Sequence, residues 1–218
     1  MVVDLLVCVA TEIEGAQLHA RLEGGRVARG TLAGREVALL RTGVGPVNAA
    51  HAVTLFLAGE RAGAVVVCGV GGAYPGSGLA VGEVACAESE IYGDLGAETP
   101  AGFLDMEALG FPLVDGPEPL YNRLPMQLFP AARRVPFVTV TSCSGTDARA
   151  RALEARTGGG VESMEGAAVA HVALLHGIPA GELRGISNLV GRRDRAGWKL
   201  REAAEAAQSA LLSWLEAP

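Results

Sequence analysis

The sequence has almost no lysine: Lys199 is the only one among 18 basic residues, and the remainder are arginines. Schiff-base chemistry and P-loop phosphate binding both need a lysine in the site, so one lysine in a polar segment argues against both. The net charge at pH 7 is −6. Nucleic acids and anionic membranes bind clustered basic side chains, so neither is expected as the main partner.

Cysteine is scarce as well, and no C-x-x-C pair occurs. The four cysteines lie far apart in apolar, strand-like segments. Free cysteines in such segments usually behave as small buried hydrophobic residues, so we expect all four thiols to be buried. They are Cys8, Cys68, Cys86 and Cys143. His171 and His176 are five residues apart and do not share a helical face. The spacing of zinc sites is therefore missing, and neither a metal nor an organic cofactor is expected.

Long uncharged apolar runs are missing too. None approaches the roughly 18 residues that a membrane span requires. Asp4 interrupts the apolar start of the chain and no basic leader precedes it, so we expect a cytoplasmic protein. What the chain does have is length and apolar content: 218 residues, half of them hydrophobic, fit one domain over 1–218 with a substantial core.

Apolar runs typical of buried parallel strands alternate with helical segments, which predicts an α/β protein with a mostly parallel sheet. Helices are expected at 12–22, from about Pro46 with Gly59 beyond the end, at 147–157, from about Glu165, and at 195–216. Strands are expected at 2–10, 26–41 (two, with a turn at Gly34), 64–70, 82–92, 136–141 and 182–188, with a short one ending near Glu162.

Residues 93–130 differ from the rest. They contain many prolines and glycines and show weak periodicity, so we expect a long loop segment rather than a second domain. A loop of that length in a compact domain is usually functional, as a lid or an interface.

Ligands of open α/β sheets bind beyond the carboxyl ends of the strands. The segments to consider are therefore 10–14, 41–46, 68–78, 141–147, 162–166 and 187–194. Two of them are rich in glycine, but GVGGAY and GVGPVN each lack the third glycine of a dinucleotide fingerprint. Tight turns and close approach of the backbone to a small ligand both remain open for these glycines.

Carboxylates follow two of the strands. Glu14 has capping-box spacing from Thr11, so it is either a helix cap or a general base that activates water; Glu12 competes for the second role. Glu165 directly precedes Gly166, at the start of a helix that is rich in small residues. It either complements the helix dipole or accepts hydrogen bonds from a vicinal diol, such as that of ribose.

One polar residue ends the last strand and another follows it. Asn188 is either a turn residue or an amide that pairs with the edge of a base, because its side chain both donates and accepts. Asp194 either caps the final helix or supplies a proton, and the sequence alone favours the cap. No Ser/His/Asp or Cys/His grouping is evident.

The segments ATEIE, LLRTGVGPVNAA, CGVGGAY, VESMEGAAVAHV and ISN occur in an order that resembles the purine nucleoside phosphorylase/nucleosidase superfamily over nearly the whole chain. They are most similar to its hydrolytic branch, which includes methylthioadenosine/S-adenosylhomocysteine nucleosidase. The resemblance implies a three-layer αβα sandwich with a mostly parallel or mixed twisted sheet. It also implies a homodimer or higher homo-oligomer, with 93–130 near the interface.

The resemblance also implies roles for particular residues. Met164 and Glu165 match the pair that holds ribose, and Glu14 matches the carboxylate that activates water where phosphorylases carry a phosphate-binding loop. Gly71 and Gly72 match the backbone near the sugar and base. Glu162 is left with a supporting role.

Asn188 stands where adenine-releasing nucleosidases have aspartate. The resemblance then implies a 6-oxopurine leaving group, hypoxanthine, with Asp194 as a possible proton source. ISNLVGRRD and MEGAAVAHV resemble the subgroup that hydrolyses futalosine, an inosine-like nucleoside of menaquinone biosynthesis. Two alternatives stay open: an adenine-releasing nucleosidase, and a nucleoside-binding protein without catalysis.

Overall fold

The computed structural model describes residues 2–131 and 133–217. Its helices are α1 (Glu12–His19), α2 (Pro46–Gly59), α3 (Met106–Leu109), α4 (Asp147–Thr157), α5 (Gly166–Leu175) and α6 (Leu200–Glu216), with 3₁₀ turns η1 (Pro75–Ser77) and η2 (Arg195–Gly197). Its strands are β1 (Val2–Val9), β2 (Glu23–Gly24), β3 (Val27–Leu32), β4 (Arg35–Arg41), β5 (Arg61–Ala73), β6 (Val84–Tyr92), β7 (Gly96–Thr99), β8 (Gly102–Asp105), β9 (Arg123–Pro125), β10 (Arg134–Thr139), β11 (Val161–Ser163) and β12 (Ala180–Leu189).

A 10-stranded mixed sheet forms the centre of the molecule, in the order β11-β10-β6-β12-β5-β1-β4-β3-β2, with β9 paired to β6. β5 pairs in parallel with β1 and with β12, and β10 pairs in parallel with β6 and β11. β12 and β6 run antiparallel. The predicted α/β class with a mixed sheet is confirmed.

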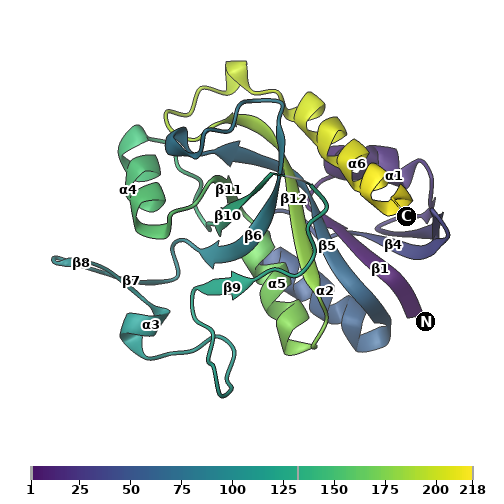
Figure 1. Cartoon of the computed structure of the whole chain (residues 1–218), viewed down its shortest axis with the longest axis horizontal. Coiled ribbons are helices and arrows are strands. Elements are labelled where there is room, and N and C mark those ends of the chain that lie inside the picture. Colours follow the sequence, from purple (N-terminus) through teal and green to yellow (C-terminus); the bar gives the residue numbers. More distant parts are fainter. Residues whose placement is uncertain (1, 132, 218) are drawn as a thin grey trace.

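Helices cover both faces of the sheet, as Figure 1 shows: α1 packs with α6 on one side and α2 packs with α5 on the other. Each face has its own apolar cluster. Val53 and Val169 belong to the cluster under α2 and α5, and Leu18 and Leu211 belong to that under α1 and α6. The small residues of α5 let it lie close to the strands, and the result is the expected three-layer sandwich.

The short strand β11 links two distant parts of the sheet. It pairs in parallel with β10 and antiparallel with β5, so that Glu162 lies opposite Gly72. Together with β6 and β12, these strands form a closed ring, whereas the sequence predicted only an open sheet. The ring brings the ends of β5, β11 and β12 together on one side of the molecule.

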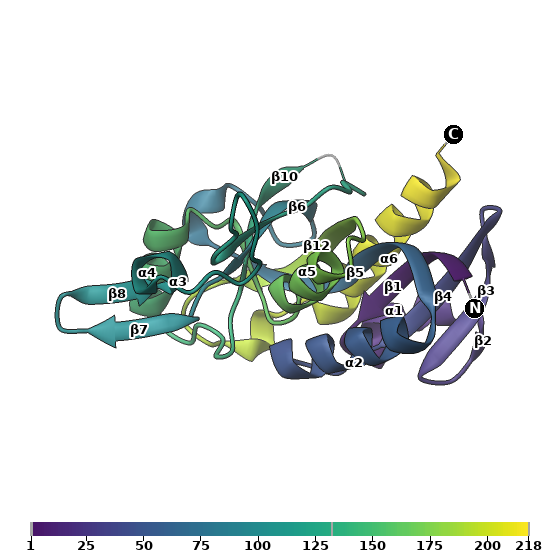
Figure 2. The ribbon, with the colours of Figure 1, turned by 90° about the horizontal axis from the view of Figure 1, so that it is seen from below.

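Residues 93–130 contain more regular structure than the sequence predicted. β7 and β8 form a hairpin, α3 follows it, and β9 joins the main sheet through β6. Figures 1 and 2 both show the β7–β8 hairpin extending away from the body of the molecule. The expectation of a structureless loop was wrong because β9 is only three residues long and depends on pairing with a distant strand, which leaves no periodic signal.

Several element boundaries also differ from the predictions, most of all those of α1, α6 and β5. The first helix ends at His19 and not at 22, and the last helix begins at Leu200 and not at 195. β5 continues beyond residue 70 through Gly71 and Gly72 to Ala73, where a loop was expected. Pairing on both edges, with β1 and β12, keeps this glycine-rich stretch extended.

Candidate functional site

A cavity of about 320 Å³ lies beyond the carboxyl ends of β1, β4, β10, β11 and β12. Its size falls in the range of small-molecule sites. Six of the residues predicted for the site line it, from four separate segments of the chain: Glu14, Gly71, Gly72, Met164, Glu165 and Asn188. The fold thus brings together almost all of the predicted site.

Glu14 reaches the cavity from the first turn of α1, with only 4% of its surface exposed. Its Oε2 accepts hydrogen bonds from the backbone N–H and the hydroxyl of Thr11, as a capping carboxylate would. Its Oε1 accepts from the N–H of Val70 at 2.9 Å. The two readings of Glu14 are therefore compatible, because one oxygen caps the helix while the other faces the cavity floor.

Glu12, the competing carboxylate, points away. Its side chain is 88% exposed and lies 3.5 Å from the guanidinium of Arg41 on the surface. It does not line the cavity. Of the two glutamates after β1, only Glu14 is placed to act there.

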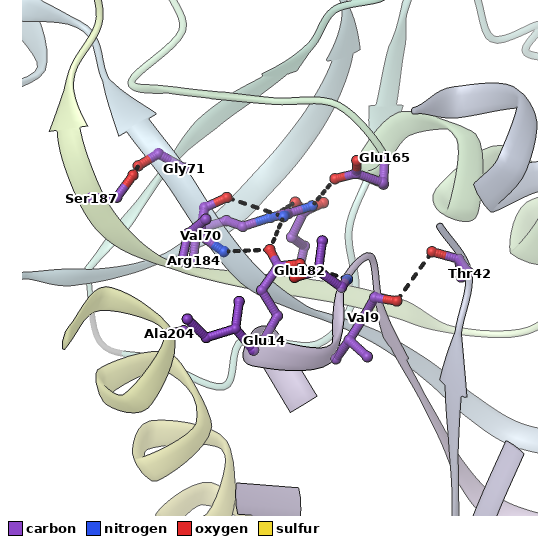
Figure 3. A network of polar contacts seen from close by, with 12 residues as sticks. Val9, Glu14, Thr42, Val70, Gly71, Glu165, Glu182, Arg184, Ser187 and Ala204 are labelled. Atoms are coloured by element: carbon purple, nitrogen blue, oxygen red, sulfur yellow. Dashed lines mark hydrogen bonds and ion pairs between the residues drawn. The ribbon is translucent and has the colours of Figure 1, made fainter. Parts of the chain in front are cut away.

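Arg184 on β12 is the residue that the sequence analysis missed, and it lies at the centre of the site (Figure 3). Its guanidinium is fully buried beside three carboxylates, and the nitrogen–oxygen distances are 2.6 Å to Glu182, 3.0 Å to Glu165 and 3.5 Å to Glu14. Burial alone would lower the pKa of this guanidinium, but the three carboxylates hold it above its ordinary value. The arginine therefore stays charged and fixes the separation of the glutamates.

Glu165 occupies the N-cap position of α5 and is also buried. Its Oε1 accepts from the backbone N–H of Gly45 at 2.9 Å, and its Oε2 faces Arg184. Neither oxygen bonds to the first turn of its own helix. The carboxylate is thus oriented by the 41–46 segment and by β12, and not by the dipole of α5 alone.

Met164 precedes this carboxylate and lines the cavity beside Cys143, whose sulfur lies 3.2 Å from that of the methionine. Cys143 is exposed, so the expectation of four buried thiols was wrong at this position; Cys8, Cys68 and Cys86 are buried. The reason is that Cys143 lies in the loop after β10 and not within a strand. Although the residue is exposed, its thiol is partly enclosed by the cavity wall; this partial burial and the nearby carboxylate of Glu162 raise its pKa, which argues against a nucleophilic thiolate.

Glu162 supports the loop after β10. Its carboxylate accepts hydrogen bonds from the N–H and hydroxyl of Ser144 at 2.8 and 2.6 Å, and from the hydroxyl of Tyr74 at 2.9 Å. Burial and the adjacent carboxylate raise the pKa of Tyr74, so its hydroxyl remains a donor. Glu162 therefore fixes the wall formed by Cys143 and Ser144.

The glycines of β5 make room for polar side chains. A Cβ at Gly69 would overlap Glu14 Oε1, and one at Gly72 would lie 3.1 Å from Asn188 Nδ2 and 2.8 Å from a methyl of Val190. At Gly71 it would lie 2.6 Å from a methyl of Val161. These glycines are neither tight turns nor loop residues; they are strand positions where neighbouring side chains need the space.

Asn188 lies near the end of β12, just after a register shift between Ile186 and Asn188. The shift inserts Ser187 as an extra residue, so both Ser187 and Asn188 line the cavity. The Asn188 amide donates to the carbonyl of Leu189 at 3.0 Å and accepts from the Ser187 hydroxyl at 2.8 Å. One N–H and one oxygen lone pair of the amide are left to meet a ligand.

Asp194 is the one predicted site residue that the fold leaves out. It is exposed, does not line the cavity, and accepts from the N–H of Ala196 at 3.1 Å. It therefore caps η2, whereas the sequence favoured a cap on the final helix. Trp198 precedes α6 and lines the cavity.

A signal for Arg184 was present in the sequence. In ELRGISN, Glu182 and Arg184 are two residues apart in a strand flanked by apolar residues, so they lie on one face. Charged side chains are almost never fully buried unless they are paired. An ion pair inside a predicted buried strand therefore indicates a functional site. The carboxylates on other segments that also contact Arg184 cannot be identified from the sequence of β12 alone.

Within residues 2–131 and 133–217, no group of three or more His, Cys, Asp or Glu side chains is arranged to hold a metal ion. In the same part of the chain, every helix is too short or too polar to cross a membrane.

Comparison with known proteins agrees with this geometry. The family model described as phosphorylase superfamily matches residues 6–216. A futalosine hydrolase of Streptomyces coelicolor is 39% identical over 181 residues, which are 79% of this chain and 76% of that protein. A futalosine hydrolase of Thermus thermophilus is 36% identical over 184 residues, 80% of this chain and 79% of that protein.

Solved structures show the same fold. The 5′-methylthioadenosine/S-adenosylhomocysteine nucleosidase of S. pneumoniae, in complex with a transition-state inhibitor, superposes with a TM-score of 0.82 at 22% identity, over 100% of this chain and 99% of that one. The nucleosidase of Colwellia psychrerythraea in complex with adenine gives a TM-score of 0.81 at 20% identity, over 97% and 93%. The resemblance found in the sequence is confirmed: this chain belongs to the phosphorylase superfamily.

Proposed function

We propose that this protein is a nucleosidase that hydrolyses the N-ribosidic bond of futalosine and releases hypoxanthine and dehypoxanthine futalosine, in menaquinone biosynthesis. Relatives named futalosine hydrolase share 35–39% identity over most of the chain. The observation that carries the chemistry is the pair of buried carboxylates, Glu14 and Glu165, held on one guanidinium at the cavity floor.

Glu165 binds the ribose. Its carboxylate accepts hydrogen bonds from the 2′- and 3′-hydroxyls, and Met164 packs beside the sugar. As the C1′–N9 bond lengthens, the sugar gains oxocarbenium character, so a hydrogen bond from the hydroxyls to a carboxylate strengthens toward the transition state. Fixation of Glu165 by Gly45 and Arg184 means that little reorganisation is needed during the reaction.

Glu14 orients and deprotonates the attacking water. Its Oε1 lies at the cavity floor, between the Val70 N–H and Arg184, with the Oε2 tied to Thr11. A carboxylate held by four donors has a fixed direction, which places the water on one side of C1′.

Asn188 receives the leaving base. Its free N–H donates to O6 and its free lone pair accepts from a protonated N7, a pattern that hypoxanthine offers and adenine does not. An amide cannot supply the N7 proton. Because Asp194 lies outside the cavity, we assign that proton to solvent.

Water, and not phosphate, is the expected nucleophile. Arg184 is the one basic side chain among the described residues that line the cavity, and three carboxylates already surround it. A phosphate entering the site would therefore face Glu14 and Glu165 without a free cation.

The direct test is to incubate the purified protein with futalosine, inosine or methylthioadenosine, with and without phosphate, and to measure the released base. Release of hypoxanthine from futalosine without phosphate supports the proposal. Release of adenine from methylthioadenosine would support the alternative nucleosidase, a strict phosphate requirement would indicate a phosphorylase, and binding without release would indicate a nucleoside-binding protein.

Asn188→Asp is expected to shift preference from hypoxanthine nucleosides toward adenine nucleosides, by at least about tenfold in the ratio of kcat/KM values. The reason is that an N–H donor toward O6 is replaced by an oxygen acceptor, and such a mismatch in an enclosed site costs about 1–3 kcal/mol. The carboxylic acid can donate to N7, whereas the carboxylate repels O6. Steady-state kinetics with futalosine and methylthioadenosine measure the ratio. An unchanged preference would remove Asn188 from base recognition.

We also propose that residues 1–218 act as one nucleosidase domain in the cytoplasm, as a homodimer or higher homo-oligomer. The buried free thiols of Cys8, Cys68 and Cys86 suit a reducing compartment. The segment 93–130 carries exposed apolar side chains, Leu95, Leu104 and Phe111, that a second copy would cover.

The oligomer proposal predicts that Leu104→Glu combined with Phe111→Glu lowers the sedimentation coefficient toward that of a monomer. A charge placed in an apolar contact is desolvated without a partner. Analytical ultracentrifugation of the wild type and the double variant at equal concentration gives the result. If the wild type is already monomeric, the proposal fails.

A further inference from the structure

Two buried glutamates behind the cavity have no role in the mechanism above. Glu90 on β6 and Glu182 on the neighbouring β12 are both 0% exposed. Within the described residues, each has one carboxyl oxygen with no hydrogen-bond partner: Oε1 of Glu90 and Oε2 of Glu182. A buried polar oxygen left unpaired is costly, so the arrangement needs an explanation.

The two unpaired oxygens converge on one point, at Gly166 in the first turn of α5. A Cβ at Gly166 would overlap Glu182 Oε2 and would lie 2.5 Å from Glu90 Oε1. This glycine therefore makes room for the acid pair. The two oxygens face each other, with the start of α5 above them.

The other oxygen of each carboxyl group is already occupied. Thr139 accepts from the N–H of Ala167 at 2.8 Å and donates its hydroxyl to Glu90 Oε2 at 2.7 Å. Glu182 Oε1 accepts from Nε of Arg184 at 2.6 Å. Both of these oxygens are acceptors, so any proton on the pair lies between the two remaining oxygens.

We infer that Glu90 is a neutral carboxylic acid that donates its proton to Glu182 Oε2, and that this acid pair is a positioning element for Arg184. The proton satisfies both unpaired oxygens with one hydrogen bond. Glu182 then keeps its full charge for Nε of Arg184, while the two terminal nitrogens of that guanidinium face Glu14 and Glu165. The Glu90–Glu182 pair thus holds Arg184 in place, and Arg184 in turn orients the two cavity carboxylates, Glu14 and Glu165.

The charges around Glu90 support the proton. Burial, and next the neighbouring Glu182 carboxylate, raise the pKa of Glu90 well above its ordinary value of 4.5. Arg184 and the Thr139 hydroxyl oppose this shift without cancelling it. On β6 itself, the nearby Tyr92 is partly buried, and burial together with the Glu90 carboxylate raises its pKa, so it stays neutral.

The positioning role is tested by comparing Glu90→Leu with Glu90→Gln. Leucine leaves Glu182 Oε2 without a donor, and we expect kcat/KM for futalosine to fall about 10- to 100-fold, because misplaced catalytic groups lose rate steeply. Glutamine can donate an N–H to Glu182 and accept from Thr139, so it should restore most of the loss. Glu60→Gln, at a half-buried ion pair with Arg29 elsewhere in the fold, serves as the control.

The proton itself is tested without activity, and this test needs only the glutamine variant. A carboxyl whose pKa is raised in the folded state binds more protons than in the unfolded state, so its contribution to stability is lost as pH rises from about 4.5 toward the folded pKa. The Tm of the wild type should therefore fall relative to that of Glu90→Gln over this range. Infrared spectra at neutral pH should show a protonated-carboxyl band that Glu90→Gln lacks.

Three results would overturn the inference: a missing carboxyl band, a Tm difference that does not change with pH, or a glutamine variant as impaired as the leucine variant. The activity readout rests on the proposed function, but the other two do not. If the wild type fails to hydrolyse futalosine while the band and the pH-dependent Tm are present, the function is wrong and the protonated pair stands.

Discussion

Glu14→Gln is expected to lower kcat for futalosine by about 10²- to 10⁴-fold, with little change in its Kd, because removal of a general base costs about that much. The amide keeps the size of the side chain and can still accept from Val70 and Arg184. It cannot take a proton from water. Single-turnover kinetics give the rate, and calorimetric titration gives the Kd.

Glu12→Gln is the matched control. It lies two residues away in the same helical turn, is exposed, and pairs only with Arg41 on the surface. We expect its kcat to equal that of the wild type. If Glu14→Gln turns over normally as well, Glu14 has no part in the mechanism.

Glu165→Gln should behave differently from Glu14→Gln. A carboxylate that accepts from two ribose hydroxyls contributes in the ground state and more strongly in the transition state. Its loss should therefore raise the Kd and lower kcat together. Identical profiles for the two variants would contradict the separate roles assigned to them.

Arg184→Met has the second large expected effect, on stability and on activity together. The substitution leaves three buried carboxylates without their shared cation, and breaking a buried ion pair in this way costs about 3–5 kcal/mol. The free energy of unfolding, measured with urea, should fall by at least that amount. Hydrolysis should be lost, because Glu14 and Glu165 then keep only their hydrogen bonds to Thr11, Val70 and Gly45 and lose the cation that offsets the repulsion between their charges.

Arg29→Met is the control for this variant. Arg29 also pairs with a glutamate, Glu60, but their side chains are 31% and 22% exposed. Partial exposure screens the charges, so its loss should cost about 1 kcal/mol or less. Equal losses for the two variants would mean that Arg184 is an ordinary ion pair and not the centre of the site.

The position of the site could be predicted from the sequence because the patterns that mark the strand ends involve residues close together in the chain. Apolar runs and helical periodicity depend on neighbouring residues, so they predicted where β1, β10 and β12 end. Polar residues at or just beyond those ends, Asn188 and Glu14, could then be placed at one edge of the sheet. The family resemblance added Met164 and Glu165 as a pair.

The errors have a common physical cause. β9 and the extension of β5 exist through pairing with strands that are distant in the sequence, which local patterns do not report. The register shift that brings Ser187 and Asn188 into the cavity together also arises from pairing between strands. Asp194 was assigned to the site through the family resemblance, whereas the sequence alone favoured a cap; in the structure it caps η2, outside the cavity.

The sequence by itself determined the α/β class, the strand exits and the types of functional group, because side-chain chemistry and periodicity are properties of the chain. Only the tertiary structure decided how these groups meet. Arg184 lies between carboxylates from three segments, and Glu90 lies beside Glu182 under Gly166. Such contacts depend on the closed ring of strands, in which residues far apart along the chain share one buried space.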